Sequence, residues 1–332
     1  MKAVALDYQK RELREVDLPE PELERDGQVL FRVREVGICG TDRDLASFRL
    51  AFPSPSGDLL VIGHECVGEV IQTNATTLKP GDIVVPLVRR PCHPPCRWCA
   101  RKRRDRCTGA YTERGISGAH GYFTELAIDA ESDLVRIPPE ICEHAVLIEP
   151  LSVVEKAIGN AFHLHPGQPE TALILGAGTV GLLAAMVLKA RGVGVTVSSP
   201  EPPNSDRARL VEEGGSNYLN RPEGPYDIII EAAGAVEAAG VALEVLGPSG
   251  VLVMLGVNKS VEVPMLRLIV RNQAIVGSVN AAPEDFELAV DDLTRMPPRI
   301  LRSMLAREPF STFRSTLTGP LRAAPKIVHV IG

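Results

Sequence analysis

The sequence lacks an excess of basic residues, and it lacks a clear membrane-spanning segment. Its 332 residues include 36 Lys and Arg against 42 Asp and Glu, which gives a net charge of -6. Because phosphate groups bind basic surfaces, this balance argues against a general nucleic-acid binder. One charge-free stretch, Thr171–Leu188, approaches the roughly 17–25 residues of a membrane helix. Its glycines 176, 178 and 181 instead favour a strand, a tight turn and a helix, so we expect no membrane partner.

The sequence also lacks a disulfide framework, internal repeats and low-complexity tracts. Seven cysteines are too few and too unevenly placed to staple a chain of 332 residues. Four of them fall between Cys92 and Cys107, which indicates a metal site in a reducing compartment. The first residues reach Asp7 without forming a secretory apolar core. We therefore expect a cytoplasmic protein.

The length favours two domains, and the first part of the chain reads as β-rich. Residues Val29–Val36 largely alternate between apolar and polar, and Cys66–Ile71 follows a turn region. The turn residues Lys79–Asp82 precede a third apolar run, Ile83–Leu87. We expect a barrel-like domain over residues 1–150, joined by a return segment, 282–332, with a strand near Ile327–Ile331.

The pattern changes after Pro150, where strands and helices begin to alternate. We predict a helix at Leu151–His163, a strand at Ala172–Leu175, a helix at Val180–Arg191 and a strand at Val193–Val197. Further apolar strands are predicted at 226–230, 250–255 and 274–276. Unbroken apolar strands separated by helices are typical of a parallel sheet that is covered on both faces. We therefore expect an α/β fold with a second domain over residues 151–281.

A glycine-rich loop follows the first strand of this second domain. It has the sequence Gly176-Ala177-Gly178-Thr179-Val180-Gly181, a G-x-G-x-x-G pattern that opens a helix. The first glycine permits the tight turn, the second admits a pyrophosphate, and the third allows close packing of helix and strand. The amides of the helix N-terminus would bind the phosphates. The loop predicts a dinucleotide site.

The end of the second strand bears on the choice between NAD and NADP. An Asp or Glu there would bind the ribose 2′-hydroxyl of NAD. The chain offers Ser198 and Ser199 instead, which favours the 2′-phosphate of NADP. However, Glu201 would reach a ribose if the loop folds back, so both cofactors remain open.

A second set of residues suits a catalytic metal. Cys39 and His64 are good zinc ligands, and a third ligand would leave one position open for a substrate. Glu149, near the junction of the two domains, is the natural candidate for that third ligand, and Asp42 could orient a ligand from behind. His64-Glu65 lacks the second histidine of the metalloprotease helix motif.

Four further cysteines, Cys92, Cys96, Cys99 and Cys107, suit a closed tetrahedral zinc site. Such a site would stabilise a loop that has little hydrophobic core. The basic run Arg101–Arg104 is offset by the acidic chain, and the pattern of a nucleic-acid-binding zinc finger is missing. We therefore expect no nucleic-acid partner.

Together these motifs resemble the zinc-containing medium-chain dehydrogenase/reductase superfamily, over essentially the whole chain. The elements that carry the resemblance are Gly37–Asp42, Gly63–Gly68, Pro80–Val84, the four-cysteine segment, Glu149–Ser152 and the nucleotide loop. Within the superfamily the chain resembles the archaeal-type glucose 1-dehydrogenase branch. The residues that point there are Arg89–Pro91, Glu113–Ile116, His120–Tyr122, Gly277–Asn280 and Phe286-Glu287.

The resemblance implies a GroES-like catalytic domain with a doubly wound Rossmann domain inserted in it. It implies that Cys39, His64 and Glu149 hold the catalytic zinc, with Glu65 as an alternative ligand or proton acceptor. Thr41 would contact the reacting hydroxyl. Glu113 and Asn280 would touch the sugar and the nicotinamide side of the cleft.

One departure from the family concerns the second zinc. The family spacing is commonly C-x2-C-x2-C-x7-C, whereas three residues separate Cys92 from Cys96 here. Either Cys92 reaches the metal through a bulged loop, or His93 takes its place. In both cases the resemblance implies two zinc ions per chain and a homo-oligomer, a dimer or a tetramer.

The activity implied is reversible hydride transfer from a sugar to C4 of NAD(P), with an aldose such as D-glucose oxidised at its anomeric carbon to the lactone. Alternatives within the superfamily are a polyol, sugar-acid or threonine dehydrogenase. A rival from another class is a non-catalytic zinc protein that senses NADPH or binds nucleic acid through Arg101–Arg106.

Overall fold

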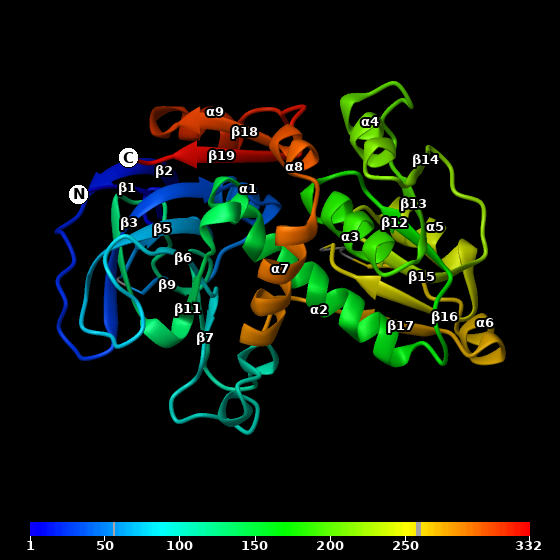
Figure 1. Cartoon of the computed structure of the whole chain (residues 1–332), viewed down its shortest axis with the longest axis horizontal. Helices are drawn as coiled ribbons and strands as arrows, with labels where there is room; N and C mark the ends of the chain where they lie inside the picture. The colour runs from blue at the N-terminus through cyan, green and yellow to red at the C-terminus, as the bar shows by residue number, and fades with distance from the viewer. Residues whose placement is uncertain (56, 257–259) are drawn as a thin grey trace.

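The computed structural model describes residues 1–55, 57–256 and 260–332. A β-rich part, formed by both ends of the chain, lies beside an α/β part formed by its middle (Figure 1). The helices α2 and α7 lie between the two parts. The fold is therefore the α/β class that the sequence predicts, with a GroES-like part and a Rossmann-like part.

The β-rich part is built around a seven-stranded sheet. Its strand order is β11-β6-β5-β3-β19-β18, and β10 also pairs with β3. The central strand β3 buries alternate side chains such as Phe31 and Val33. A Cβ at Gly68 of the neighbouring strand would lie 2.3 Å from the Phe31 ring, so this position requires glycine. A smaller sheet of order β2-β1-β4 packs beside it.

The bounds of the strands and helices in this part follow the chain from its N-terminus. They are β1 Lys2–Asp7, β2 Glu12–Asp17, β3 Gln28–Gly37, α1 Gly40–Ala46, β4 Leu59–Val61, β5 Glu65–Thr73, β6 Ile83–Pro86, β7 Arg89–Arg90, β8 Thr112–Arg114, β9 Gly118–Ala119, β10 Leu126–Ala130, β11 Leu134–Arg136, β18 Leu305–Pro309, α9 Phe313–Thr318 and β19 Lys326–Val330. Short 3-10 turns lie between them: η1 Cys99–Arg101, η2 Arg104–Arg106, η3 Glu131–Asp133, η4 Pro139–Leu147 and η5 Phe310–Thr312.

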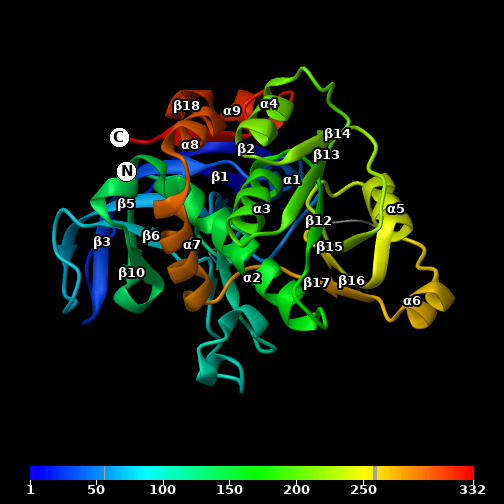
Figure 2. The same cartoon turned by 45° about the vertical axis from the view of Figure 1, so that its right-hand side comes forward.

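The α/β part is a six-stranded parallel sheet of order β14-β13-β12-β15-β16-β17. Side chains on opposite faces of its strands enter different cores: Ile174 and Ile228 pack with α3, whereas Leu173 and Ile229 pack with α5. The two helices therefore cover opposite faces, as the turned view shows (Figure 2). This is the doubly wound arrangement that the unbroken apolar strands predict.

The elements of the middle and the following segment have these bounds: α2 Ile148–Leu164, β12 Thr171–Leu175, α3 Thr179–Ala190, β13 Gly194–Ser198, α4 Asp206–Glu213, β14 Asn217–Leu219, β15 Tyr226–Glu231, α5 Val236–Val245, β16 Leu246–Met254, α6 Met265–Arg271, β17 Ala274–Gly277, α7 Pro283–Arg295 and α8 Pro298–Met304. Among the described residues no helix is both long and apolar enough to cross a membrane.

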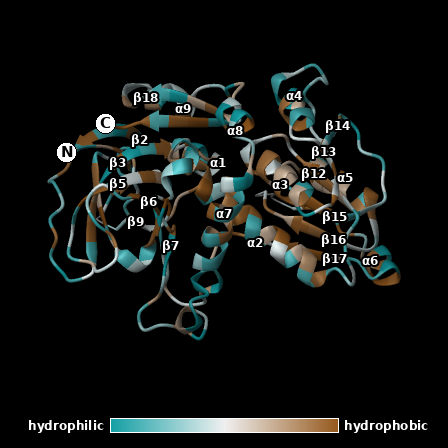
Figure 3. Ribbon diagram, viewed as in Figure 1, coloured by the Kyte–Doolittle hydropathy of each residue, from teal (hydrophilic) through white to brown (hydrophobic). Residues whose placement is uncertain are grey.

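Helix α2 begins three residues before the predicted start, so Glu149 and Pro150 lie in its first turn. Proline is tolerated there because the first amides of a helix have no intrahelical acceptor. One hydrophobic core runs from Val67 of the β-rich part through α2 to Phe286 of α7 and Ile174 of the parallel sheet. In Figure 3 the ribbon of the central strands is largely coloured as hydrophobic, whereas many outer loops are coloured as hydrophilic. This shared core holds the β-rich part and the α/β part in a fixed relation to each other.

Candidate functional site

The glycine-rich loop lies between β12 and α3, in the strand–turn–helix setting that dinucleotide loops require. Gly176 has a φ of 106°, a region that favours glycine, and Gly178 forms the N-cap of α3. A Cβ at Gly181 would lie 1.9 Å from the carbonyl oxygen of Gly176, so the third glycine is required as well. Thr179 donates a hydrogen bond from its hydroxyl to Pro325 O at 2.7 Å, which ties the loop to the return segment.

The end of β13 offers both a carboxylate and a guanidinium. Ser199 donates a hydrogen bond from its hydroxyl to the Glu201 carboxylate, and Arg207 lies 3.3 Å from the same carboxylate. Ser198 donates to Asn220 O. A carboxylate suits a ribose hydroxyl, and a guanidinium suits a 2′-phosphate.

The second feature is a cluster of potential metal ligands in the β-rich part. The Cys39 thiol, a His64 ring nitrogen and a Glu65 carboxylate oxygen all lie within 4.8 Å of one another. Cys39 precedes α1, while His64 precedes β5 and Glu65 begins it. Gly37 is paired with Glu65, and a Cβ there would lie 2.2 Å from the Glu65 carboxylate. A thiol, an imidazole and a carboxylate form a donor set that fits zinc.

Asp42 lies behind this cluster, against the ring of His64. Its carboxylate is buried and lies 3.2 Å from Nδ1 of His64. Burial lowers the pKa of His64, but the Asp42 carboxylate and the Cys39 thiol together outweigh that effect and raise the pKa well above its ordinary value. With Nδ1 facing Asp42, Nε2 is the nitrogen that remains for a metal, which is the common carboxylate–histidine–metal arrangement.

Glu149, the third ligand that the sequence suggests, lies outside the 4.8 Å group, although it is buried near the same charges. Burial, together with the neighbouring Glu65 carboxylate, raises its pKa to about 7 against the opposing charges of His64 and Lys326. The structure thus brings Glu65 into the ligand group and keeps Glu149 beside it. Which carboxylate binds the metal stays a prediction, as does the role of Thr41, the second residue of α1.

Lys326, in the return strand β19, is a site residue that the sequence did not reveal. Its ammonium lies 2.7 Å from one carboxylate oxygen of Glu65 and 2.5 Å from the other, and it donates to Ile38 O. Both side chains of the ion pair are about 97–98% buried, with 3% and 2% exposed. Burial lowers the pKa of Lys326, but the acidic groups around it, Glu65 first, together raise the pKa above its ordinary value. No local motif marks this lysine, because its partner lies 261 residues away.

A cavity of about 220 Å³ joins the nucleotide loop to the metal-ligand cluster. Its lining includes Cys39 and Glu65 from one half and Gly178, Thr179 and Val180 from the other. Lys326 lines it as well. The hydride acceptor of a dinucleotide and the oxygen of a metal-bound substrate would therefore share one space.

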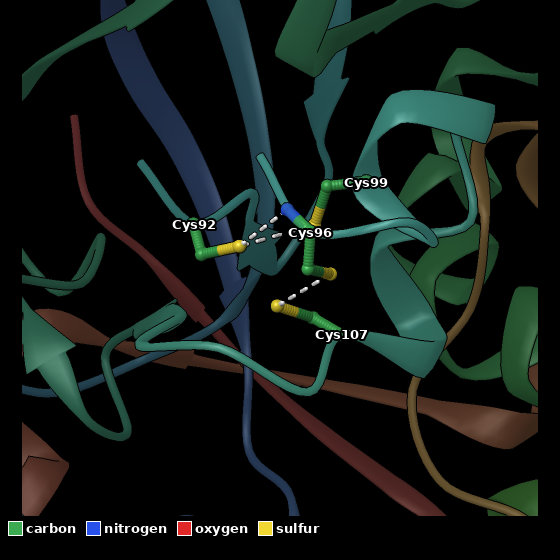
Figure 4. Close-up of side chains that lie close together, drawn as sticks. All are labelled: Cys92, Cys96, Cys99 and Cys107. Carbon is green, nitrogen blue, oxygen red and sulfur yellow. Dashed lines mark hydrogen bonds between the residues drawn. The ribbon is translucent and has the colours of Figure 1, made fainter. Parts of the chain in front are cut away.

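The four remaining predicted ligands form a separate cluster in a lobe of the β-rich part. The thiols of Cys92, Cys96, Cys99 and Cys107 converge on one point and lie within 4.8 Å of one another (Figure 4). The amide of Cys96 donates to the Cys92 sulfur at 3.2 Å, so the longer loop bends back toward the cluster. His93 is exposed and is not part of the 4.8 Å group.

The chemistry of this lobe fits a bound cation. Backbone amides of Cys99 and Thr108 lower the pKa of the Cys96 thiol to about 5, while burial raises that of Cys99 to about 12. Four thiolates this close repel one another unless a cation compensates them, and tetrahedral zinc is the usual one.

Two family models match the chain. The alcohol dehydrogenase GroES-like domain matches residues 25–139, and the glucose dehydrogenase C-terminus matches residues 142–317. The chain belongs to the glucose dehydrogenase branch of the zinc-containing medium-chain dehydrogenase/reductase superfamily. The resemblance inferred from the sequence is confirmed.

Relatives of this branch align over most of their length. The glucose 1-dehydrogenase of Thermoproteus tenax is 40% identical over 321 residues, which cover 89% of this chain and 90% of the relative. The glucose 1-dehydrogenase 1 of Vulcanisaeta moutnovskia is 41% identical over 84% of this chain and 83% of its own. The solved Haloferax mediterranei glucose dehydrogenase, in complex with NADP, Zn and gluconolactone, superposes with a TM-score of 0.91 at 33% identity, over 100% of this chain and 99% of that one.

Glu113 and Asn280, which the family resemblance assigns to the sugar and the nicotinamide side of the cleft, also meet. Asn280 donates a hydrogen bond from its amide to the Glu113 carboxylate at 2.8 Å, and Arg89 pairs with the same carboxylate at 2.9 Å. Glu113 lies in β8, whereas Asn280 lies between β17 and α7 with a φ of 60°. The structure thus brings together two predicted residues that are 167 positions apart.

Proposed function

We propose that this chain is a zinc-dependent glucose 1-dehydrogenase. D-glucose would lose a hydride from its anomeric carbon to C4 of NAD(P) and a proton from its anomeric hydroxyl, giving the lactone, NAD(P)H and one proton. The observation that carries this proposal is the shared cavity, whose lining includes Cys39 and Glu65 of the metal-ligand cluster together with the nucleotide loop at 178–180. The relatives named glucose 1-dehydrogenase and the Haloferax complex support the choice of sugar.

In this proposal, the residues of the chain have the following roles. Cys39, His64 and either Glu65 or Glu149 would hold the catalytic zinc, and Asp42 would fix the ring of His64. A bound zinc supplies Lewis-acid polarisation of the substrate oxygen. The Thr41 hydroxyl and the Glu65 carboxylate would accept and pass on the hydroxyl proton, while Lys326 holds Glu65 in its place.

The test is an initial-rate assay of D-glucose and D-galactose with NAD and with NADP, extended to polyols, sugar acids and threonine. Both nucleotides are needed because the end of β13 carries Glu201 as well as Arg207. Turnover of polyols or threonine without turnover of aldoses would refute the sugar assignment.

Two serine variants test the metal assignment. Cys39→Ser should lose activity and one zinc per chain, because it removes a thiolate ligand. The matched control is Cys142→Ser, since Cys142 is a free, partly buried thiol whose sulfur contacts Pro138 O. The control should keep both properties. Full turnover and zinc content in Cys39→Ser would refute the assignment.

We extend the proposal to the number of zinc ions and to the domain division. Two zinc ions per chain are expected, one at the Cys39 cluster and one at the four-cysteine lobe. Residues 1–150 and 282–332 would form the catalytic domain, and residues 151–281 the nucleotide-binding domain. None of the seven cysteines, all of which lie among the described residues, forms a disulfide, which agrees with a reducing cytoplasm.

We also propose that the chain self-associates through α6 and β17. Strand β17 lies at the end of the parallel sheet and pairs only with β16 among the described residues. The preceding helix α6 exposes four apolar side chains by 60–76%: Met265, Leu266, Ile269 and Val270. They give α6 apolar colour at the edge of the molecule (Figure 3). An exposed edge strand beside an apolar patch is a typical interface between two copies of one chain.

A further inference from the structure

The four-cysteine lobe has a buried connection to the nucleotide-binding half of the molecule. The connection begins at Asp105 in the 3-10 turn η2, two residues before Cys107. The Asp105 side chain is fully buried, and Arg103 donates to both of its carboxylate oxygens at 3.0 and 2.8 Å. Lys156 of α2 approaches the same carboxylate at 2.8 Å with only 7% of its own side chain exposed. The four-cysteine lobe is thus joined to α2 by the buried ion pair between Asp105 and Lys156.

Lys156 carries the connection to the loop between β17 and α7. Its ammonium donates a second hydrogen bond, at 2.8 Å, to the carbonyl oxygen of Val279. The side chain of Val279 is 63% exposed, so its own packing does little to fix this loop. The next residue is Asn280, whose positive φ of 60° is uncommon for a residue other than glycine. The Lys156 contact therefore restrains the backbone directly before that turn.

A second route leaves the same acidic residue and ends at the same place. Arg89 donates to the backbone carbonyl of Asp105 at 2.8 Å and to the carboxylate of Glu113 at 3.0 and 2.9 Å. Glu113 accepts the amide hydrogen bond of Asn280. The two routes close a ring in which the lobe holds Glu113 on one side and Asn280 on the other. Movement of the lobe would shift both residues.

We propose that Lys156 and Asp105 are positioning residues through which the four-cysteine lobe sets the Glu113–Asn280 pair for the sugar. This inference rests on the proposed function, because the pair is the predicted sugar contact. Within the described part of the chain, the Lys156 ammonium contacts Val279 O and the Asp105 carboxylate, and it makes no hydrogen bond or ion pair with the Cys39–His64–Glu65 cluster or the nucleotide loop. Its effect should therefore appear in sugar binding and not in hydride transfer.

The test compares Lys156→Met with Lys156→Arg. The methionine keeps the apolar stem and removes the charge, whereas arginine can still bridge the Asp105 carboxylate and the Val279 carbonyl. We expect Lys156→Met to raise the KM for glucose and the Kd for gluconolactone about tenfold, with kcat reduced less than threefold. Lys156→Arg should restore both constants to within about threefold. The matched control is Lys189→Met, since Lys189 is an exposed lysine of α3 and should behave as the wild type.

The inference is overturned if Lys156→Met changes sugar and lactone binding no more than Lys189→Met, or if kcat falls while KM stays constant. If Lys156→Met does not fold, Asp105→Asn takes its place, because it keeps the shape and one acceptor oxygen. For the inference to stand, Asp105→Asn must also raise the KM for glucose while kcat falls less than threefold.

An amide-exchange measurement separates this inference from the proposed function. A wild-type enzyme that oxidises no aldose refutes the proposed function. The positioning role is then decided by hydrogen exchange in residues 278–281. Faster exchange in Lys156→Met than in Lys189→Met supports the role, and equal exchange overturns it.

Discussion

Replacing Lys326 by methionine should be among the most destabilising single changes in the β-rich half. The change leaves the Glu65 carboxylate buried without its cation, although the two charges lie 2.5–2.7 Å apart. At an effective dielectric constant of about 20, a pair at such a distance attracts by roughly 6 kcal/mol before desolvation is subtracted. Removing one partner of a buried pair typically costs about 3–5 kcal/mol. We expect a loss in that range.

The measurement is urea unfolding at a fixed zinc concentration, for the wild type, Lys326→Met, Glu65→Gln and the double variant. Because either single change strands a buried charge, the double variant should lose less stability than the sum of the singles, by about 2 kcal/mol or more. The matched control is Lys2→Met. Lys2 forms an ion pair with Glu15 at 2.8 Å, but its side chain is 57% exposed. Exposed pairs contribute about 0–1 kcal/mol.

Two results would refute this reasoning. One is a loss in Lys326→Met as small as that in Lys2→Met. The other is additivity of the two single variants, since independent effects would mean that Lys326 and Glu65 do not stabilise each other.

Three further predictions concern other parts of the chain. Gly181→Ala should abolish NADP binding in calorimetric titration, because the new Cβ would lie 1.9 Å from a backbone carbonyl oxygen. The control Gly159→Ala meets nothing within 4 Å and should stabilise α2 by about 0.5–1 kcal/mol in thermal unfolding. Tight NADP binding by Gly181→Ala would contradict the packing argument. The Thr77 hydroxyl and nearby amides lower the pKa of Glu131 to about 2, so its contribution to stability is present above about pH 4.5 and is lost as the pH falls toward 2. Glu131→Gln should accordingly flatten the pH dependence of urea unfolding in that window, and an unchanged slope would disprove the assignment. Leu266→Asp should turn an associated protein into a monomer in light scattering, and a monomeric wild type would overturn the proposed interface.

The sequence predicts most of the fold, because its signals are local. The alternation at Val29–Val36 falls within β3, Gln28–Gly37, and the apolar run at Ala172–Leu175 falls within β12, Thr171–Leu175. The glycine loop is predictable for the same reason, since turn, close approach and helix start are encoded in six consecutive residues. The start of β16 was harder to predict from the sequence. The strand begins at Leu246, four residues before the predicted start, although Gly247 and Pro248 are residues typical of turns.

The contacts that complete the site were not predictable, because they join residues that are distant in sequence. Nothing near Lys326 identifies Glu65 as its partner, and nothing near Lys156 identifies Asp105 or Val279. A buried lysine and an exposed one have the same sequence pattern until the packing of their strand or helix is known. The family resemblance supplied candidate residues such as Glu113 and Asn280, but the ring that connects them to the lobe required the structure.

The position of β19 between β3 and β18 has a consequence for the order of events in the cell. Glu65 is synthesised 261 residues before Lys326. At about 5–20 residues per second, roughly 13–50 s of translation separate the two. During that interval the parallel sheet emerges as one continuous segment and can fold, whereas the Cys39–His64–Glu65 cluster still lacks its counter-charge. The nucleotide-binding half would then fold before the proposed metal-binding half is complete, which would make maturation of the catalytic metal site a late step of biogenesis.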